Sequence, residues 1–336
     1  MWNMLQRISK NLVLAIPAAM LVGFAWGLLG DTSWMRALIL PFTFLMVYPM
    51  MVTLKIREVF SGGDGKAQFL RQCINFGLIP FLAFGVAQLF FPDRPTLVLG
   101  LLLAGLVPTS GMTISWTGFA GGKVAAAVKM TVIGLILGSL ATPFYVKALL
   151  GEAITVNVSG VMGQIALIVF LPMAAGYATQ RFLVARHGQQ AFATRIGPRF
   201  PALSTLGVLG IVLIALAMKA QTIVQAPGLL AEILVPLCLL YGANYLISTI
   251  LARWLLPRGE AIAMVYGTVM RNLSIALAVA MNAFGTSGSE AALVVALAYV
   301  IQVQSAAWYV KLTDRVFGQA PLAAPAPAVV AEAISR

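Results

Sequence analysis

Residues 105–122 read GLVPTSGMTISWTGFAGG, an apolar stretch that Pro108 interrupts near its middle. The stretch belongs to an apolar run over about residues 96–119, which is long enough to cross a bilayer as a helix. Pro108 removes one helical hydrogen bond, and Gly111 tolerates irregular backbone dihedral angles. The sequence therefore predicts a membrane helix that is broken halfway. The hydroxyl groups available to bind the freed backbone groups, or a ligand, belong to Thr109, Ser110 and Thr113.

The composition of the whole chain agrees with a membrane location. Of 336 residues, 60% are hydrophobic and 10% are charged, against roughly 25% charged in a soluble domain. These proportions exclude a soluble enzyme, a disordered chain and a nucleic-acid-binding domain. Two Cys and one His leave too little material for a disulfide framework, and we expect neither a metal site nor a cofactor. The class that remains is an all-α integral membrane protein.

Ten apolar runs lie between polar or Gly/Pro breaks, and each is a candidate membrane span. The longest loops that we expect between them are 55–68 and 185–200. The Ala/Pro-rich end, residues 319–336, is typical of a disordered tail. The ten runs cover about residues 11–30, 34–54, 69–91, 96–119, 123–149, 160–184, 201–224, 228–252, 259–284 and 289–312.

The distribution of positive charge predicts the orientation of these spans. With the N-terminus in the cytosol, 16 of the 22 Lys and Arg residues, Arg71 among them, lie on the inner side. This asymmetry follows the positive-inside rule and predicts a multi-pass protein of the inner (plasma) membrane with both termini cytoplasmic. Four cations lie on the outer side, Arg36, Arg94, Lys147 and Lys219, and two fall within spans, Lys129 and Arg271.

The chain has signs of an internal repeat. The fifth span ends in Phe-Tyr-Val-Lys at Lys147 and the tenth in Trp-Tyr-Val-Lys at Lys311, and the third and eighth spans each hold one Cys and one Asn, Cys73 with Asn75 and Cys238 with Asn244. We therefore predict two five-helix repeats, residues 1–155 and 160–318. Because five is odd, the two copies must have opposite membrane orientations.

The ninth span carries its polar residues where the fourth span is broken. Residues 266–274 read YGTVMRNLS, and Gly267 favours a second helix break there. Arg271 lies thirteen residues beyond Arg258, about 19 Å along a helix. A cation at that depth faces a cavity or a partner by default. Either an anionic ligand or a set of helix-end carbonyls can compensate it, because no acidic residue lies at mid-depth in any span.

Lys129 is the other cation within a span. It lies six residues after Lys123, about 9 Å along the helix. One interpretation is that its long side chain reaches the inner interface. The other is that Lys129, together with Thr131, takes part in proton-linked coupling.

Two stretches resemble a known family. Residues 105–122 and residues 270–279, MRNLSIALAV, are similar to the fourth and ninth helices of the bile acid:sodium symporter superfamily, which includes the arsenite-efflux permeases. The run LPMAAG around Pro172 and the pair Tyr48-Pro49 look more like the arsenite-permease branch. The resemblance implies a core domain built on crossed broken helices 4 and 9, with a panel domain that moves against it for alternating access.

The departures from the sodium-coupled branch concern its cation ligands. Around the ninth helix this chain resembles that branch except at two positions: Gly267 replaces the Glu of the branch, and Arg271 replaces its Gln. The Ser-Asn pair of the fourth helix falls on 113–114, Thr-Ile, and of the fifth-helix hydroxyls only Thr131 remains, the other being Ala127. A conventional two-sodium site is therefore not expected.

The departures from the arsenite permeases concern a thiol and a carboxylate. In that branch a Cys follows the fourth-helix Pro and a Glu lies on the ninth helix, whereas this chain has Thr109 and Ser274 there. Thiolate capture of As(III) at that position is impossible. Cys73 and Cys238, on other helices, make a poor substitute.

We therefore expect a secondary transporter, and not an enzyme, that moves a small anionic solute by alternating access. Arsenite or antimonite efflux and sodium-coupled organic-anion symport stay open as alternatives, as does a sensor or scaffold that has kept the fold. The expected partners are the solute and the lipid bilayer, without nucleic acid, and a homo-oligomer stays open. The expected substrate-binding residues are Arg271, Asn272, Thr109, Ser110, Thr113, Ser274 and Asn75, with helix breaks at Pro108, Gly111 and Gly267.

Overall fold

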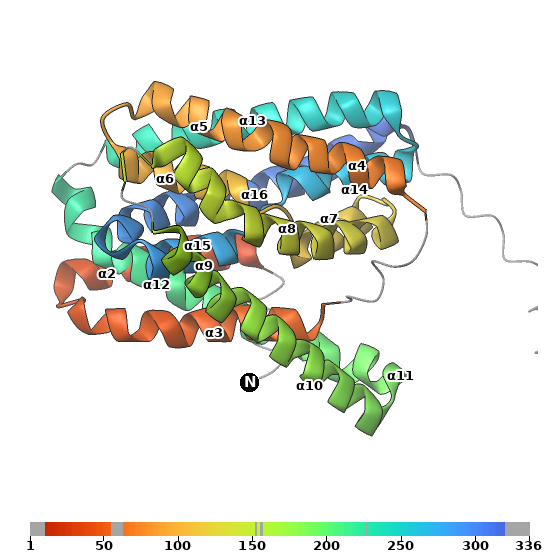
Figure 1. The fold of residues 1–336 in the computed structure, drawn as a ribbon, viewed down its shortest axis with the longest axis horizontal. Helices are drawn as coiled ribbons and strands as arrows, with labels where there is room; N and C mark the ends of the chain where they lie inside the picture. The colour runs from red at the N-terminus through yellow and green to blue at the C-terminus, as the bar shows by residue number, and fades with distance from the viewer. Residues whose placement is uncertain (1–10, 55–62, 152, 155–156, 226–227, 320–336) are drawn as a thin grey trace, which may run out of the picture.

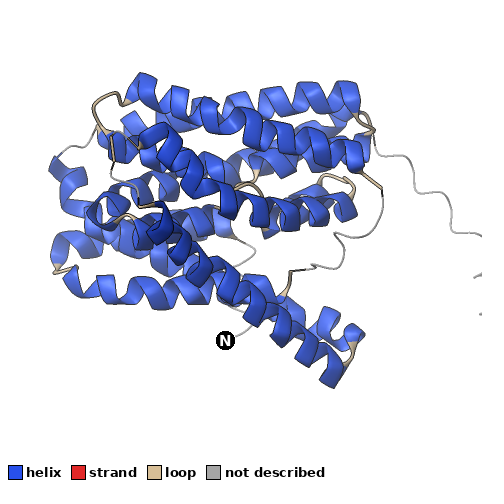
Figure 2. Cartoon of the chain, viewed as in Figure 1, coloured by secondary structure: helices blue, strands red, loops and turns tan. Residues whose placement is uncertain are grey.

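The computed structural model describes residues 11–54, 63–151, 153–154, 157–225 and 228–319. Within these residues the chain is a bundle of helices joined by loops (Figure 2), and most of the helices run along the long axis of the molecule (Figure 1). All of the expected tail after residue 319 and most of the expected loop over 55–68 fall outside the described residues. The all-α architecture predicted from composition is confirmed.

The helices follow the predicted apolar runs closely, and two of the runs are split in two. The fourth run forms α6 and α7, and the ninth forms α14 and α15. In chain order the elements are α2 (Leu12–Leu29), η1 (Ser33–Met35), α3 (Arg36–Val52), α4 (Gly65–Gln72), η3 (Cys73–Leu78), α5 (Ile79–Phe90), α6 (Pro95–Leu106), α7 (Gly111–Phe119), α8 (Val124–Leu150), α9 (Val158–Ile165), η4 (Ala166–Phe170), α10 (Leu171–His187), α11 (Gln189–Ala191), η5 (Phe192–Ile196), η6 (Gly197–Arg199), α12 (Phe200–Gln225), α13 (Leu229–Leu255), α14 (Arg258–Val269), α15 (Leu273–Ala283) and α16 (Gly285–Phe317).

Seven helical stretches among the described residues are long and apolar enough to cross a bilayer. Three shorter apolar helices accompany them, and two of these, α6 and α15, are halves of the interrupted segments. The protein is thus a multi-pass membrane protein. Ten crossings arranged as two inverted repeats stay a prediction.

Two boundaries differ from those expected. The third span begins at Gly65 instead of residue 69, so Arg71 lies one and a half turns inside a helix. The expected loop over 185–200 is mostly helical, because α10 runs to His187 and short helical turns follow it. Gly188 ends α10 with a φ of 82°, a conformation that glycine adopts without steric cost.

The helices form two layers. α12 packs against both α2 and α3, with α10 beside α3, in the lower part of Figure 1, and α5 to α8, α13, α14 and α16 lie above them. Glycines allow the close contacts of the lower layer. A Cβ atom at Gly23 of α2 would lie 2.3 Å from the carbonyl oxygen of Leu213 in α12, and one at Gly207 of α12 would lie 2.3 Å from the backbone nitrogen of Met46 in α3. Small residues at helix interfaces are typical of membrane proteins.

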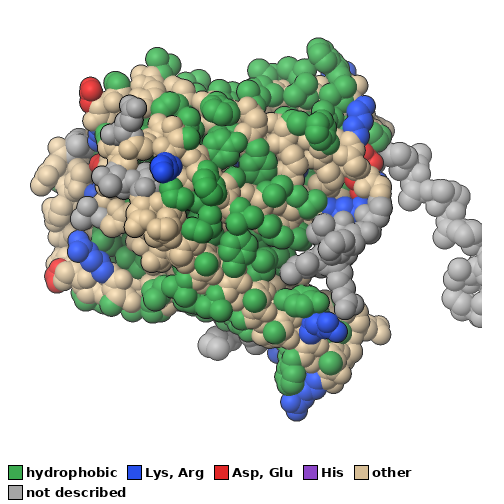
Figure 3. Space-filling model, in the orientation of Figure 1, with side chains coloured by type: hydrophobic (Ala, Val, Ile, Leu, Met, Phe, Trp, Pro, Cys, Tyr) green, Lys and Arg blue, Asp and Glu red, His purple; other side chains and the backbone are tan. Residues whose placement is uncertain are grey.

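Apolar side chains cover the outside of the bundle. Figure 3 shows them across the middle of the visible face, with most of the visible Lys and Arg side chains toward its two ends. Leu29, Leu89 and Trp254 are more than three-quarters exposed. A soluble protein rarely exposes so much apolar surface, so this surface matches a lipid environment.

Candidate functional site

The two helix breaks meet at the centre of the bundle. Pro108, in the break between α6 and α7, pairs with Arg271, in the break between α14 and α15, as an isolated antiparallel bridge. The backbone N–H of Asn272 donates to the carbonyl oxygen of Val107 over 2.8 Å. Each break therefore satisfies backbone groups that the other leaves free, as unpaired backbone groups at membrane depth require.

A side chain of α16 completes this pairing. Gln302, which is fully buried, accepts the N–H of Arg271 at its Oε1 over 2.8 Å and donates from its Nε2 to the carbonyl oxygen of Arg271 over 3.1 Å. The hydroxyl of Tyr241 donates to the same Oε1 over 3.0 Å. Sequence reasoning missed Gln302. The signal was an amide side chain inside the apolar run 289–312, a type of residue that is costly there without a partner.

Gln302→Met is expected to destabilise the protein by about 2 kcal/mol, because it leaves the N–H and the carbonyl of Arg271 without their partner. The substitution keeps the length of the side chain, so little cavity forms. Thermal unfolding in detergent measures the effect. The stability of Gln302→Glu should lie between the stabilities of Gln302→Met and the parent, since a carboxylate still accepts the N–H of Arg271 but cannot donate to its carbonyl oxygen. Equal stability of Gln302→Met and the parent would contradict this role.

The amino-terminal ends of α7 and α15 are capped by their own side chains. Ser110 accepts the N–H of Met112 at 3.2 Å, and its own N–H donates to Thr113 Oγ1 at 3.3 Å, which forms a capping box. Asn272 Oδ1 accepts the N–H of Ile275 at 3.2 Å. Three of the predicted binding residues thus hold the helix ends in place.

The irregular backbone of the first break lies at Thr109 and not at Gly111. Thr109 has a φ of 65°, in the left-handed region, whereas Gly111 is the first residue of α7. A β-branched residue rarely adopts this conformation, and such strain concentrates at functional sites. The hydroxyl oxygen of Thr109 lies 2.6 Å from the carbonyl oxygen of Pro108 and 3.2 Å from the carbonyl oxygen of Thr131.

The carboxyl end of α14 is bound by amides and by a cation. Asn75 Nδ2 and Arg71 Nε both donate to the carbonyl oxygen of Gly267, each over 3.1 Å, and Asn244 Nδ2 donates to that of Thr268 over 3.1 Å. Gly267 itself lies in the last turn of α14, so the expectation that it breaks the helix is corrected: the break begins at residue 270. Its small size matters, because a Cβ there would lie 2.7 Å from the sulfur of Met130.

Arg71 is the principal residue that sequence reasoning misplaced. Counted among the inner-side cations, it is fully buried instead, and a Cβ at Gly134 of α8 would lie 2.0 Å from one of its terminal nitrogens. The early start of its helix explains the error. Arg271 is 2% exposed and lies close enough to Arg71 for the two charges to repel. Among the described residues, the terminal nitrogens of both guanidinium groups have no hydrogen-bond partner.

Lys129 lies apart from these two arginines, in a cluster at one end of the bundle. Its ammonium group donates to Asp64 Oδ2 over 3.2 Å and to the carbonyl oxygen of Gly63 over 3.3 Å. Lys123 also binds Asp64, and it reaches Glu260 over 3.1 Å. Lys129 is 4% exposed, and the ion pair that it forms with the loop carboxylate of Asp64 is therefore buried.

A cavity of about 320 Å³ lies between the two layers of helices. No charged side chain is among the described residues that line it. Ser110 and Gly111, at the start of α7, and Ser274, in the first turn of α15, face it together, so both amino-terminal helix ends open into one space. The other lining residues are Met50, Thr53, Met112, Ile114, Ser115, Pro201, Ser204, Thr205, Val208 and Tyr299.

The remaining predicted residues line smaller spaces. Asn272 and Thr131 line a space of about 50 Å³ that shares Gly111 with the larger cavity. Arg271 lines a separate space of about 10 Å³ with Tyr241 and Asn244. The structure therefore brings the two helix starts to the large cavity and places the arginine on another side of the crossing. No three His, Cys, Asp or Glu side chains of the described residues lie together as metal ligands.

Comparison with known proteins places the chain in a family. Residues 40–226, more than half of the chain, match the Sodium Bile acid symporter family. The chain is 25% identical over 285 residues to the Arsenical-resistance protein Acr3 of Alkaliphilus metalliredigens, which covers 81% of this chain and 79% of that protein. It is 22% identical to the protein of the same name from Corynebacterium glutamicum, over 74% of this chain and 70% of that one.

A third relative has no assigned function. It is an uncharacterised protein of Pseudomonas aeruginosa, 28% identical over 63% of this chain and 64% of that protein. These similarities agree with the fold and with the interrupted helices that cross at its centre. The chain therefore belongs to the Sodium Bile acid symporter family, and it is a membrane transporter rather than an enzyme.

Proposed function

We propose that this protein moves a small anionic solute by alternating access, with the solute bound in the 320 Å³ cavity. The observation that carries the proposal is the arrangement of α7 and α15, whose amino-terminal ends both open into that cavity. Capping side chains already accept the N–H groups of Met112 and Ile275, so the helix dipole is what makes each end favourable for an anion. Two ends that face one uncharged, hydroxyl-lined space form an anion site without a cation in direct contact.

The two buried arginines supply fixed positive charge beside this cavity. Arg71 neutralises the carboxyl end of α14, and Arg271 adjoins the last turn of α6 at Gly105. No acidic residue is among the described residues that line the cavity. An anionic solute is therefore the group that can compensate the positive charge of Arg71 and Arg271. Electrostatic attraction extends over several ångströms in a medium of low dielectric constant. Arg271 thus acts on the solute through its field in this conformation.

Arg71 also removes the need for a transported cation. Elsewhere a mobile cation can compensate the carboxyl ends of broken helices, whereas here Arg71 and Asn75 donate to the carbonyl oxygen of Gly267 at that end of α14. We therefore infer a carrier that is independent of sodium. Export of an anion from an inside-negative cell is favoured by about 2.3 kcal/mol per charge per 100 mV, so it requires no coupling ion.

The two layers of helices support a proposal of alternating access. The cavity lies between α3 and α12 on one side and α7, α15 and α16 on the other. We propose that the chain forms ten crossings in two inverted repeats, in the inner membrane with both termini cytoplasmic. Relative movement of the layers would expose the cavity to each side in turn.

Arg271→Gln is expected to weaken anion binding about tenfold, since it removes one unit charge near the helix ends. The purified protein is heated with a panel of carboxylates and oxyanions, with sodium and with arsenite. A ligand at 100 times its dissociation constant adds about 2.7 kcal/mol of stability. An anion-specific shift in the parent that Arg271→Gln diminishes supports the proposal.

Arg94→Gln is the matched control, because Arg94 is exposed and pairs with Glu232 at 2.9 Å, away from the cavity. It should leave the anion response unchanged. Flux of the selected anion into liposomes then separates a carrier from a sensor or scaffold. An anion shift that survives Arg271→Gln intact would contradict the role of this arginine, and a shift with sodium would favour a sodium-coupled organic-anion symporter.

Efflux of arsenite or antimonite is the second candidate. It is favoured by the likeness to proteins named arsenical-resistance proteins and by the uncharged cavity with several serine hydroxyls. Both cysteines are exposed and outside the cavity lining, so capture would have to use hydroxyl groups. Lower arsenite accumulation in cells that express the protein would support this candidate, and unchanged accumulation would count against it.

A further inference from the structure

The connection between α10 and α12 projects from one end of the bundle. Figure 1 shows α10 running obliquely past the lower layer of helices, with α11 at its far end. We call residues 181–199 the elbow; they comprise the last turns of α10 together with α11, η5 and η6. Phe192 of η5 is buried. The elbow is therefore a packed helical turn and not an extended loop.

One face of α10 is exposed along the length of the helix. Leu171 and Phe182 are 52% and 61% exposed, and at eleven residues apart they lie on the same face, three turns from each other. The exposed positions between Leu171 and the elbow carry only alanine. The opposite face packs on α3, where a Cβ at Gly176 would lie 2.8 Å from the backbone of Met51. The exposed face thus continues the apolar surface that matches lipid.

The exposed face becomes basic at the end of α10. Arg181 and Arg186 are exposed, with Phe182 and Ala185 between them, and Figure 3 shows basic and apolar side chains together on the projecting part. The helical stretch Val158–His187 has 30 residues and is about 45 Å long, whereas the hydrocarbon core of a bilayer is about 30 Å thick. Its last turns therefore pass beyond the hydrocarbon even when the helix is tilted. The change from apolar to basic residues marks the level of the lipid headgroups.

The elbow has no acidic residue to neutralise it. The sequence contains no Asp or Glu over residues 153–231, whereas the elbow carries four arginines and one histidine. Elsewhere on the predicted inner side, Arg258 pairs with Asp314 over 2.6 Å. No carboxylate of the described residues pairs with Arg186 or Arg195. The charges of these two arginines are therefore open to an anionic group outside the protein.

We propose that the elbow binds the headgroups of anionic phospholipids. Arg181, Arg186 and Arg195 bind the phosphate groups, since guanidinium groups form paired hydrogen bonds with phosphate. Phe182 lies at the boundary with the acyl chains, where aromatic residues are favoured. A lipid fits this surface better than an acidic protein, because the arginines continue a helix face that is already exposed to lipid. Since α10 packs on α3 and the elbow leads into α12, the bound lipids hold this layer of helices at the membrane surface.

A fluorescent label at position 185 reports which lipids surround the elbow. Ala185→Cys is introduced into the full-length chain together with Cys73→Ala and Cys238→Ala, since both native cysteines are exposed, and it is modified with bimane. Ala185 is exposed and lies between Arg181 and Arg186. The protein is held in phosphatidylcholine nanodiscs in which a small fraction of the lipid carries a doxyl quencher near its headgroup. The readout is the ratio of quenching by doxyl-phosphatidylglycerol to quenching by doxyl-phosphatidylcholine at equal fractions.

This ratio is expected to be at least about five in the parent at low salt, because each basic residue at an anionic surface strengthens binding by roughly that factor. High salt should lower the ratio, since it screens exposed charges. Arg181→Gln/Arg186→Gln should bring the ratio close to one, whereas Arg181→Lys/Arg186→Lys should keep most of it. The ratio is an internal comparison, so a change in protein yield does not affect it.

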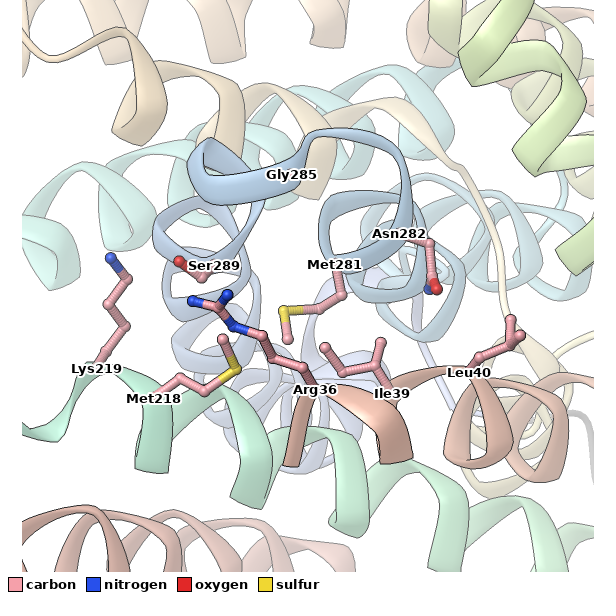
Figure 4. A pocket seen from close by; sticks show the side chains of 9 residues that line it. All are labelled: Arg36, Ile39, Leu40, Met218, Lys219, Met281, Asn282, Gly285 and Ser289. Atoms are coloured by element: carbon pink, nitrogen blue, oxygen red, sulfur yellow. The ribbon is translucent and has the colours of Figure 1, made fainter. Parts of the chain in front are cut away.

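Arg36→Gln/Lys219→Gln is the matched control, because it changes the net charge by the same amount in the same layer of helices. Arg36 of α3 and Lys219 of α12 line a separate cavity of about 600 Å³, and Figure 4 shows their side chains extending toward the side where Ser289 lies. This double variant should leave the ratio unchanged. A second control carries the label at Leu246→Cys, on the lipid-facing side of α13, where Leu246 is 62% exposed and a ratio close to one is expected.

Equal quenching by the two lipids at position 185 in the parent would overturn the proposal. So would a high ratio that Arg181→Gln/Arg186→Gln retains, or an equally high ratio at position 246, since the preference would then not belong to the arginines. If the parent shows no lipid preference but copies cross-link through the cysteine at position 185, the elbow binds a second copy and the proposal fails. No step involves the transported solute, so the result is independent of the proposed function.

Discussion

Asp64→Asn is expected to destabilise the protein by about 3–5 kcal/mol, the range found when one partner of a buried ion pair is removed. The side chains of Asp64 and Lys129 are 2% and 5% exposed, and their charged atoms are 3.2 Å apart. The substitution preserves size, and Asn tolerates the left-handed conformation that Asp64 adopts with a φ of 65°. Loss of charge is therefore the main change, and it leaves the buried ammonium of Lys129 without its carboxylate.

Glu260→Gln is the control for this effect. Glu260 binds Lys123, whose side chain is 44% exposed, over 3.1 Å. An exposed ion pair contributes at most about 1 kcal/mol. Unfolding of both variants in mixed micelles, followed by tryptophan fluorescence, measures the difference. Similar losses in Asp64→Asn and Glu260→Gln would show that burial of the pair does not matter.

The pH dependence of the same pair has a definite sign. Burial alone would raise the pKa of Asp64, but hydrogen bonds from Lys123 and Lys129 outweigh burial and hold that pKa below its usual value. A lowered folded-state pKa gives stability that is present above the unfolded value, about 3.9, and is lost as the pH falls through the folded value. The advantage of the parent over Asp64→Asn should thus stay constant from pH 7 to about pH 4 and shrink only in stronger acid.

Arg71→Met is expected to separate stability from function. Burial of a charged side chain costs several kcal/mol in desolvation, and the hydrogen bond that the substitution removes contributes about 1 kcal/mol. Asn75 continues to donate to the carbonyl oxygen of Gly267. We therefore expect a gain of about 2 kcal/mol in the free energy of unfolding, together with about tenfold weaker anion binding, because one fixed charge is lost.

Arg71→Lys is the matched variant for this prediction. It keeps the positive charge and should therefore retain more of the anion response than Arg71→Met in the same thermal measurements. A structural role alone would give the opposite pattern, in which Arg71→Met lowers stability and the anion response of the folded fraction is unchanged. Flux in liposomes then checks whether the more stable Arg71→Met protein transports more slowly.

The presence of a break in each of the two helices could be predicted from local sequence, but the residues at which the backbone becomes irregular and the contacts of the breaks could not. Pro108 cannot continue a helical hydrogen-bond pattern, so its effect depends only on its own residue type. The pairing of Pro108 with Arg271, and the part of Gln302 in it, joins segments that are more than 150 and 30 residues apart respectively. No local pattern encodes such a contact. The tertiary structure imposes the left-handed backbone conformation on Thr109, although Gly111, two residues later, could adopt it without steric cost.

The two cations within predicted spans show the same difference between what local sequence predicts and what tertiary contacts decide. Sequence depth alone indicated that Arg271 is buried, and it is. The depth of Lys129 in its span could not predict its ion pair with Asp64, because Asp64 lies 65 residues earlier in the chain, in a loop. Arg71 was misplaced because a shift of four residues in a helix start moves a side chain by about 6 Å, from the interface into the core.

The sequence by itself determined that this protein is helical, lies in a membrane and carries a segment interrupted at Pro108, because hydrophobicity and the missing N–H of proline act locally. The tertiary structure decided which groups meet. It brought the amino-terminal ends of α7 and α15 to one cavity and buried Arg71 beside Gly267. The physical reason is that a buried polar group needs a partner from whichever helix packs against it, and packing is a property of the whole bundle.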